Sequence, residues 1–434
     1  MMKISEMPKY EVYKDSGVEW LGDIPASWSL LANKHIFRLK KKQVGKRSSE
    51  YDLLSLTLRG VIKRDMENPE GKFPAEFDTY QEVRCGDFIF CLFDVEETPR
   101  TVGLSPFNGM ITGAYTVFEL NDNFDNRFLY YFYMNLDAKK MLKPLYRGLR
   151  NTIPKDSFLS FKTFVPPHEQ QTRIANFLDK KTALIDEAIS IKEKQISLLK
   201  ERKQIIIQQA VTQGLDPNVP MKDSGVDWIG KIPAHWDLVK LGSCLSPVSV
   251  KNSPELPLLS ITREQGVIER DVDDQESNHN FIPDDLSGYK KLEKGQFGMN
   301  KMKAWQGSYG VSKFTGIVSP AYFVFDFTKA INPEFFNWAI RSKLYVSFFG
   351  SASDGVRIGQ WDLSKARMKV IPFVLPSEEE QLLIAKHLDE KLEQVDVAIK
   401  IKLQQIERLR EYRSSLINSA VTGKIKITPE MVEQ

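Results

Sequence analysis

Two stretches of the sequence mix cationic, amide and aromatic side chains in a way that suits contact with a nucleic acid. One is a basic cluster within residues 34–47, and the other is the loop-like stretch 300–309, which reads NKMKAWQGSY. Lysine and arginine neutralise phosphates, whereas arginine, asparagine and glutamine present paired hydrogen-bonding groups to base edges. The alternative for both stretches is a solvated charged face of the same composition.

A glycine–x–arginine motif occurs twice, at Gly148–Arg150 and at Gly355–Arg357, each time shortly before a predicted strand and a long predicted helix. A turn glycine beside a structural arginine would give the same motif, so both interpretations stay open. Together with cations near recurring positions of the chain, these residues make up the predicted nucleic-acid contacts: Lys40, Lys42, Arg59, Lys63, Arg64, Arg147, Arg150, Asn151, Arg263, Arg270, Lys301, Lys303, Gln306, Tyr309, Arg357 and Gln360.

No arrangement of residues predicts catalysis. The sequence lacks a GxxxxGK[ST] phosphate-binding loop and the Asn-Pro-Pro-aromatic signature of amino-methyltransferases, and its five histidines lack metal-ligand spacing. Asp284-Asp285 followed by Lys290-Lys291 resembles the carboxylate and lysine residues of a nuclease active site only poorly. We therefore predict a chain that binds, with no catalytic site, no metal and no cofactor of its own. The alternatives are an enzyme that acts on nucleic acid alone through an unfamiliar site, and a coiled-coil scaffold that binds only proteins.

The length and composition are those of an ordinary globular protein. The chain has 434 residues, a length that suggests two or three domains. It contains 60 Lys+Arg and 57 Asp+Glu, and the resulting formal net charge of +3 excludes a protein that binds nucleic acid simply through a large overall positive charge. Its longest fully apolar stretch, 88–93, is far too short to span a bilayer, and the N-terminus has no apolar signal region. The three cysteines cannot form a disulfide framework, so we expect a cytoplasmic protein that makes no contact with a membrane.

The chain contains an internal repeat of about 210 residues. Residues 14–30 read KDSGVEWLGDIPASWSL and residues 222–238 read KDSGVDWIGKIPAHWDL, with 12 of 17 positions identical and Trp20 and Trp28 in register with Trp228 and Trp236. Weaker matches follow, such as LLSLT with LLSIT, Gly-Val-Ile in both copies, and Arg64-Asp65 with Arg270-Asp271. The repeat indicates a duplication in which two variable regions have different roles on a common frame.

Each repeat ends in a long segment with heptad spacing, 169–213 and 379–422. A sustained 3.5-residue spacing makes an apolar seam that must pair with another helix, and about 45 residues correspond to roughly 65–70 Å. The two seams match position by position, so we predict an antiparallel coiled coil that holds the variable regions apart; an ordinary helical hairpin is the alternative. The seam residues are Leu178, Ile185, Ile189, Ile196, Leu199, Leu388, Val395, Ile399, Ile406 and Leu409.

The first of these helices carries a second apolar stripe outside the seam. Its members again recur every seven residues, whereas the equivalent positions of the second helix are mostly polar. An additional stripe must be buried under a folded domain or under a partner subunit, and the sequence favours neither. The predicted partner-interface residues are Phe177, Leu184, Ile191, Leu198 and Ile205.

Both variable regions have the pattern of mixed α/β domains with a small positive excess. Residues 31–165 contain 21 Lys+Arg against 17 Asp+Glu, and residues 239–371 contain 17 against 14. Short β-branched and aromatic runs bounded by Gly, Pro and Asn predict strands, and two aromatic stretches predict helices. The predicted strands are 53–58, 87–93, 114–120, 161–165, 258–262, 321–327 and 369–374, and the predicted helices are 127–142 and 334–349.

With these residues in view, the chain resembles the specificity (S) subunit of type I restriction–modification systems. The resemblance rests on the peptides WLGDIPASW and WIGKIPAHW, and on long helices that begin near PPHEQQTRIANFLD and LPSEEEQLLIAKHLD and end in Ala-Val-Thr. It covers essentially the whole chain. No base-reading residue transfers by motif, because the recognition domains of this family vary widely.

The resemblance implies a non-catalytic subunit in which each of two target recognition domains reads one half of a bipartite, asymmetric site in double-stranded DNA. It implies that the coiled coil sets the spacer and docks two methyltransferase subunits that carry S-adenosylmethionine, and that endonuclease subunits using ATP and Mg²⁺ join where they exist. The implied fold is mixed α/β (α+β) with a pseudo-two-fold repeat. Its predicted segments are an N-terminal repeat segment (1–30), target recognition domain 1 (31–166), a central spacer helix (167–214), a second repeat segment (215–238), target recognition domain 2 (239–376), a C-terminal spacer helix (377–424) and a tail (425–434).

Overall fold

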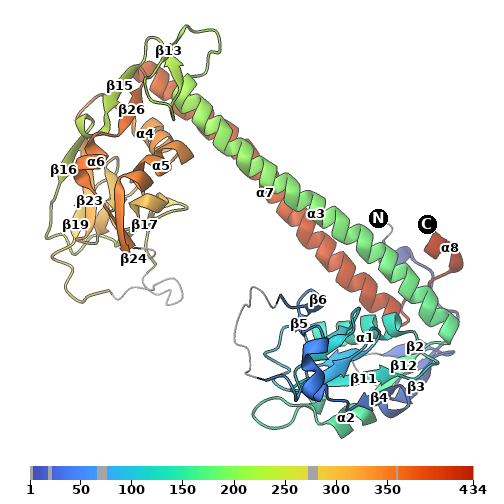
Figure 1. The fold of residues 1–434 in the computed structure, drawn as a ribbon. Helices are drawn as coiled ribbons and strands as arrows, with labels where there is room; N and C mark the ends of the chain where they lie inside the picture. Colours follow the sequence, from blue (N-terminus) through green and yellow to red (C-terminus); the bar gives the residue numbers. More distant parts are fainter. Residues whose placement is uncertain (1–2, 18–21, 66–75, 272–281, 358–359, 434) are drawn as a thin grey trace. The chain divides into compact units, whose positions relative to one another are not determined.

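The computed structural model describes residues 3–17, 22–65, 76–271, 282–357 and 360–433, with the side chains of 356–360 left out of the description. Its internal contacts divide the chain into two units (Figure 1). Unit 1 comprises Met1–Lys192 with Gln404–Gln434, and unit 2 comprises Glu193–Leu403. Each unit therefore contains one strand-rich domain and about half of each of the two long helices.

Unit 1 is built on a four-stranded antiparallel sheet in the order β4-β11-β8-β9, accompanied by four two-stranded pairs. The sheet consists of β4 (Phe37–Lys40), β11 (Thr116–Leu120), β8 (Phe88–Phe90) and β9 (Val102–Leu104). The pairs are β1 (Tyr13–Asp15) with β2 (Asp23–Pro25), β3 (Ser29–Ala32) with β12 (Lys162–Val165), β5 (Leu54–Thr57) with β6 (Gly60–Lys63), and β7 (Gln81–Val83) with β10 (Gly109–Ile111). Its shorter helices are α1 (Asn126–Ala138), α2 (Lys155–Ser160) and α8 (Pro429–Glu433).

Unit 2 repeats this plan strand for strand. Its sheet has the order β16 (Leu245–Val248), β23 (Tyr322–Phe327), β20 (Phe297–Asn300), β21 (Tyr309–Val311). The pairs are β13 (Met221–Asp223) with β14 (Lys231–Pro233), β15 (Asp237–Lys240) with β26 (Pro372–Leu375), β17 (Leu259–Thr262) with β18 (Gly266–Glu269), β19 (Lys290–Leu292) with β22 (Gly316–Val318), and the additional β24 (Ser353–Arg357) with β25 (Gln360–Leu363). Its shorter helices are α4 (Pro333–Ile340), α5 (Lys343–Ser351) and α6 (Lys365–Lys369).

The sequence predicts one helix over 334–349, but the structure has two. Arg341 ends α4, and Ser342 adopts an extended backbone with φ −64° and ψ 152° before α5 begins. Helical periodicity cannot detect this break, because aromatic residues face the core on both sides of it. Arg341, which follows the last residue of α4, is half-buried.

The repeated peptide has a structural role that explains its identities. Lys14 Nζ donates to the carbonyl of Trp28 over 2.6 Å, and Lys222 Nζ donates to the carbonyl of Trp236 over the same distance. Both of these tryptophans are buried. Trp20 lies outside the described residues, and its counterpart Trp228 is exposed. The lysine and the second tryptophan therefore shape the same hairpin in both units.

Each long helix ends on the tryptophan of a repeat peptide. Gly423, which follows α7, has φ +72°, and a Cβ there would lie 3.4 Å from Trp28 and 2.3 Å from Pro25. Gly214, which follows α3, has φ +79°, and a Cβ there would lie 3.2 Å from Trp236. Only glycine combines a left-handed backbone with this close approach. The C-terminal end of α7 is thereby packed into unit 1, and that of α3 into unit 2.

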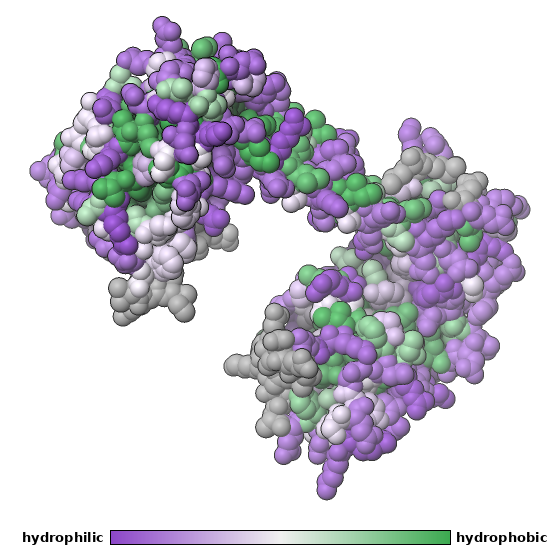
Figure 2. All heavy atoms as spheres, turned by 45° about the horizontal axis from the view of Figure 1, so that its top comes forward, coloured by the Kyte–Doolittle hydropathy of each residue, from purple (hydrophilic) through white to green (hydrophobic). Residues whose placement is uncertain are grey.

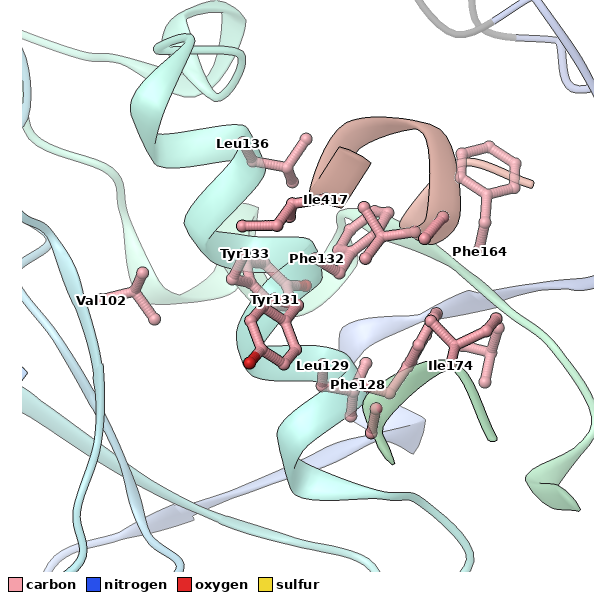
Figure 3. Close-up of a cluster of buried hydrophobic side chains, with 14 of the residues drawn as sticks. Val102, Phe128, Leu129, Tyr131, Phe132, Tyr133, Leu136, Phe164, Ile174 and Ile417 are labelled. Carbon is pink, nitrogen blue, oxygen red and sulfur yellow. The ribbon is translucent and has the colours of Figure 1, made fainter. Parts of the chain in front are cut away.

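The helix α1 joins the unit 1 sheet to the long helices through a continuous apolar core (Figure 3). Figure 3 shows α1 residues such as Phe128 and Phe132 beside Ile174, Ile417 and Phe164, and all five side chains are buried. Unit 2 has a corresponding core in which the buried aromatic residues of its sheet and of α4 and α5 reach the helix residues Leu388 and Ile207. The burial of each aromatic side chain of this kind stabilises the folded state by about 1.5–3 kcal/mol.

The long helices α3 (His168–Gln213) and α7 (Glu378–Val421) pack together, as the heptad pattern predicts. All ten seam residues are buried or half-buried. In unit 1 the Arg413 guanidinium pairs with Asp186, and in unit 2 Lys203 Nζ lies 2.7 Å from Asp396. Asp186 and Arg413 correspond to Asp396 and Lys203 through the 210-residue offset of the helices. The two ion pairs are therefore internal copies of one another, and both require antiparallel helices.

The segment after Gly423 packs against unit 1. Ile425 and Ile427 are buried in the unit 1 core, and the Lys426 N–H donates to the Pro8 carbonyl over 2.7 Å. Lys180 on α3 donates to the carbonyls of Val432 and Glu433 at the end of α8.

Candidate nucleic-acid interface

A buried glutamine at the start of each long helix attaches the strand-rich domain to that helix. Gln171 accepts the Asp125 N–H at the beginning of α1 over 2.9 Å and donates to the Pro166 carbonyl over 2.9 Å. Gln381 accepts the Asn332 N–H at the beginning of α4 over 2.8 Å and donates to the Pro376 carbonyl. The sequence contains glutamine at both of these positions, 210 residues apart. A polar residue at the start of a helix gives no indication, however, that its side chain is buried.

Replacing Gln171 by alanine is expected to lower the free energy of unfolding by about 1–3 kcal/mol, because the Asp125 N–H and the Pro166 carbonyl lose their partner in a buried place. Chemical denaturation of the full chain measures this change. The matched control is Gln208→Ala, which removes the same side chain from an exposed position of α3 and should change stability by less than about 0.5 kcal/mol. Equal effects of both substitutions would contradict the attachment role.

The β5–β6 hairpin and the β17–β18 hairpin carry several of the predicted contacts in equivalent places. Arg59 and Arg263 lie exposed in the two hairpin turns. Arg64 and Arg270 are half-buried just after β6 and β18. Lys63 is exposed, but its Nζ lies 2.6 Å from Asp52 and 5.4 Å from the centre of the Phe107 ring. The structure thus brings the recurring cations onto one hairpin in each unit.

Unit 2 also contains a lysine cluster that the sequence analysis did not predict as a group. Lys290 and Lys365 line a cleft of about 240 Å³ together with Phe323. Lys290 Nζ donates to the Tyr322 carbonyl over 2.6 Å, and Lys365 Nζ lies 4.4 Å from the centre of the Phe323 ring. Burial, together with the positive charges of Lys365, Lys251 and Lys301, lowers the pKa of Lys290. An anion such as a phosphate, bound in the cleft, would reduce the electrostatic repulsion between these lysines.

The stretch 300–309 divides between exposed and buried residues. Lys303 is exposed and Gln306 half-buried around a short 3-10 turn. Lys301 Nζ lies 3.3 Å from Asp362, so part of its charge is neutralised. Trp305 stacks on Trp361 of the additional hairpin, with ring centres 5.0 Å apart.

Tyr309 requires a correction, because its side chain is fully buried. It belongs to β21, and its ring centre lies 4.6 Å from that of Phe349 within the unit 2 core. Burial raises the pKa of its hydroxyl. An aromatic residue in a polar stretch was predicted to meet DNA, but strand alternation turns this one inward. Tyr309 is therefore not retained among the candidate contacts.

The first glycine–x–arginine motif forms a tight turn in which the arginine is held by an acid. Gly148 has φ +67°, and the turn is closed by backbone hydrogen bonds between Arg147 and Thr152. The Arg150 guanidinium donates twice to Asp94, which lowers the pKa of that carboxyl. The Arg150 side chain is 71% exposed in this pair, so both interpretations of the motif stay open and Arg150 stays a predicted contact.

The residues around this motif have similar internal partners. The Arg147 guanidinium donates to the carbonyls of Pro144 and Tyr146, and Asn151 Nδ2 donates to Glu97. In the second motif the backbones of Arg357 and Gln360 pair between β24 and β25, and their side chains lie outside the described part of the chain.

Lys40 also requires a correction. It lies on the buried side of β4, its side chain is 8% exposed, and its Nζ is 2.7 Å from Asp87. The charge of this lysine is therefore compensated inside the domain and is unavailable to a phosphate. Lys42, two residues on, is half exposed and pairs with Glu82 over 2.7 Å. Hydrogen bonds from Lys42 and Tyr51 lower the pKa of Glu82 to about 2, against the opposing effect of burial.

The predicted partner stripe on α3 has one buried member and four exposed ones. Phe177 is 1% exposed within the unit 1 core, so it is covered by its own domain. Leu184, Ile191, Leu198 and Ile205 are 50%, 51%, 56% and 49% exposed. Figure 2 shows hydrophobic residues at the surface of the long helices among hydrophilic ones. Exposed leucine and isoleucine at heptad spacing form an unusually regular apolar surface.

Within the described ranges, no group of three or more histidine, cysteine, aspartate or glutamate side chains is arranged to hold a metal ion. No helix in the described parts of the chain has the length and apolar character needed to cross a membrane.

Comparison with known proteins gives consistent matches. Residues 102–201 match the family model of the type I restriction modification DNA specificity domain. The chain is 25% identical over 317 residues to a putative type I restriction enzyme MjaX specificity subunit of Methanocaldococcus jannaschii, covering 69% of this chain and 68% of that relative. It is 27% identical over 204 residues to the type I restriction enzyme EcoDI specificity subunit of Escherichia coli, covering 45% and 40%.

Two solved structures share the fold over almost the whole chain. One is a chain from a study of complex assembly and conformational transition of the type I R-M system, with a TM-score of 0.66, 14% identity and coverage of 92% and 98%. The other is the HsdS subunit from Thermoanaerobacter tengcongensis, with a TM-score of 0.52, 14% identity and coverage of 93% and 98%. The duplicated fold, the paired helices and these matches agree: residues 102–201 carry a type I restriction modification DNA specificity domain, and the chain is similar over 69% of its length to a type I restriction enzyme specificity subunit.

Proposed function

We propose that each unit of this chain reads one half of a bipartite, asymmetric site in double-stranded DNA, and that the length of the α3–α7 pair sets the number of base pairs between the halves. The observation that carries the proposal is the duplication itself. Both units have the same strand order and the same glutamine attachment to a long helix, but their hairpin turns differ in sequence. Two similar frames with different exposed side chains are suited to reading two different half-sites.

Joint binding by two weak readers would give the chain its selectivity. When one unit is bound, the other meets its half-site at a high effective concentration, which raises affinity by about 10²–10⁴ only when the gap fits. The cations of the hairpins and of the Lys290 cleft would neutralise phosphates, and the affinity must then fall as salt rises.

The reaction on DNA would be carried out by partners. We propose two methyltransferase subunits that carry S-adenosylmethionine and methylate adenine after flipping it from the duplex, and endonuclease subunits with ATP and Mg²⁺ where the system has them. Within this scheme the chain holds the register on DNA and supplies no reacting group.

Exchange of residues 31–166 for the corresponding domain of another specificity subunit tests the half-site assignment. The expected result is a methylation pattern in which one half of the recognised sequence changes while the other half and the gap stay the same. Sequencing of modified bases in DNA from cells carrying the exchanged chain and its methyltransferase subunits measures this. A change in both halves would contradict the proposal.

The exposed α3 stripe is the proposed docking surface for the methyltransferase subunits. Leu198→Asp should strongly reduce co-purification of these subunits, because a charge would have to be buried at an apolar contact. It should leave the unfolding free energy of the chain almost unchanged, since Leu198 is already 56% exposed. Lys200→Asp, at an exposed position of the same helix outside the stripe, is the control. Undiminished assembly of the Leu198→Asp chain would exclude this surface.

A further inference from the structure

The β5–β6 and β17–β18 hairpins have turns of similar design. In unit 1 the turn is Leu58–Arg59, and the Thr57 hydroxyl accepts the Arg59 N–H over 3.1 Å and donates to the Gly60 carbonyl over 3.0 Å. In unit 2 the turn is 263–265, and the Thr262 hydroxyl accepts the Gln265 N–H over 3.1 Å and donates to the Gly266 carbonyl over 3.3 Å. A threonine therefore closes both turns from within.

In each unit, the side chain of an arginine outside the hairpin donates hydrogen bonds to backbone carbonyls of the turn and thereby fastens it. In unit 2, Arg341 Nη2 donates to the carbonyls of Arg263 and Glu264 over 3.0 and 2.8 Å, and Nη1 donates to the Tyr309 carbonyl over 2.6 Å. In unit 1, Arg100 Nη2 donates to the Leu58 carbonyl over 3.1 Å, and Nη1 lies 3.4 Å from the Tyr130 hydroxyl.

The two fastening arginines are not copies of one another. Arg100 precedes β9, whereas Arg341 ends α4, so each unit holds its turn with a residue from a different element. Two separate solutions to the same backbone constraint indicate that the position of the turn matters in both units. A lysine could not replace either arginine, because only the planar guanidinium fork reaches two or three acceptors at fixed angles.

The surrounding glycines leave room for this arrangement. A Cβ on Gly266, which has φ +75°, would lie 2.8 Å from Arg341 Nη1. A Cβ on Gly103 of β9 would lie 2.6 Å from Leu56 and 2.7 Å from Val61 of the first hairpin. The hairpins are therefore packed closely on the sheets, and their turns are held rather than loose.

The side chains at the turns, in contrast, are exposed and differ between the units. Leu58 is 66% exposed, and Arg59, Arg263, Glu264 and Gln265 are also exposed. The flanking strands are nearly the same, with Leu-Ser-Leu-Thr and Gly-Val-Ile in unit 1 against Leu-Ser-Ile-Thr and Gly-Val-Ile in unit 2. A fixed frame thus presents different groups, and arginine and glutamine are the residues that pair with guanine and adenine edges.

We propose that the turns 58–59 and 263–265 enter the major groove and read bases, and that Arg100 and Arg341 are positioning residues that hold these turns. This inference rests on the proposed function, because it assigns the reading of each half-site to one hairpin. A two-stranded ribbon fits the width of the major groove. Holding the turn in place before binding avoids the entropic cost of ordering it on the DNA.

The test uses the full chain assembled with its methyltransferase subunits and a library of duplexes containing randomised half-sites. Replacing both Arg263 and Gln265 by alanine should lower the preference for the cognate base at one or two positions of one half-site by roughly 5- to 150-fold. The other half-site and the gap should be unaffected. Lys329→Ala, which removes an exposed cation elsewhere in unit 2, should leave the base preference of both half-sites unchanged.

Arg341→Lys separates positioning from simple charge. It should broaden the base preference of the same half-site while assembly and the protection of the buried Cys244 thiol stay at wild-type levels. An unchanged base preference in Arg341→Lys would overturn the positioning role. If the Arg341→Lys variant loses the protection of Cys244, unit 2 is destabilised and its base preference is not interpreted. The variants of the exposed turn residues then test the proposal, because they remove no buried contact.

The outcomes also distinguish this inference from the proposed function. A wild-type complex without sequence preference would refute the proposed function. A selective wild-type complex whose preference is unchanged by the turn variants, both Arg263→Ala with Gln265→Ala and Arg59→Ala, would refute the assignment to the hairpins while leaving half-site reading intact.

Discussion

Replacing Lys40 by valine is expected to lower the free energy of unfolding of unit 1 by about 3–5 kcal/mol, because it leaves a buried carboxylate without its cation. Lys40 and Asp87 are 8% and 7% exposed, and Lys40 Nζ also lies 3.7 Å from Glu119. Glu119 retains the guanidinium of Arg38. Among the described residues, the Asp87 carboxylate retains the Arg84 N–H, which donates to it over 2.7 Å. Asp87 is therefore the group whose charge loses its compensation.

Unit 2 indicates how the loss can be repaired. By the strand registers, Lys40 opposite Val117 corresponds to Val248 opposite Val324, and Asp87 before β8 corresponds to Gln296 before β20. Gln296 donates to Asp326 over 2.8 Å and accepts the Glu293 N–H over 2.8 Å. Lys40→Val combined with Asp87→Gln should therefore recover most of the stability, since a neutral amide replaces the unpaired carboxylate.

The cysteines allow this stability to be measured for each unit separately. Cys91 is buried in unit 1, Cys244 is buried in unit 2, and Cys85 is exposed. A thiol reagent should modify Cys91 of the Lys40→Val chain roughly 150- to 5,000-fold faster than in the wild type, which is 3–5 kcal/mol at one factor of ten per 1.36 kcal/mol. Cys244 should react at its wild-type rate. Unchanged protection of Cys91 would show that the ion pair contributes little.

The long helices could be predicted from the sequence because their signal is periodic and long. Heptad spacing over about 45 residues identifies a seam whatever the surrounding domains do. The same argument identified the second stripe, but it did not show that Phe177 is covered by its own domain. Periodicity locates a face of a helix and does not say which part of that face a neighbouring domain covers.

The exposure of the cations in the strand-rich domains was predicted less well, because charge composition does not reveal which way a side chain points. Lys40 and Lys42 belong to the same basic cluster, but the first is buried against Asp87 and the second is exposed. Arg341 lies inside the predicted helix 334–349, whereas in the structure it directly follows the last residue of α4. The lysines around the Lys290 cleft are far apart in sequence, so only the fold brings them together.

Insertion of one heptad into both long helices is expected to reduce binding to the original DNA site by about 10²–10⁴, because the two units would no longer meet their half-sites together. The insertions belong between Lys192 and Glu193 of α3 and between Leu403 and Gln404 of α7, where the two units divide. The pairs Asp186–Arg413 and Lys203–Asp396 then stay within their own units. Seven residues add about 10.5 Å, or about three base pairs.

Three added base pairs are not expected to restore binding fully, because DNA and helix differ in phase. A heptad returns the α-helix almost to the same face, whereas about three base pairs turn the duplex by roughly 100°. Three heptads add about 31.5 Å, close to one turn of DNA, and rotate each half-site back towards its reader. The three-heptad chain should therefore bind strongly to sites whose gap is longer by about nine or ten base pairs.

Binding of these chains to duplexes with stepwise longer gaps measures the relation between helix length and spacing. Insertion into α3 alone is the control, because helices of unequal length cannot keep both ion pairs and the seam, and that chain should lose stability. A three-heptad chain that keeps its preference for the original gap would exclude the helix pair as the element that sets the spacing. A chain that accepts every gap equally would instead show that the two units bind DNA independently of one another.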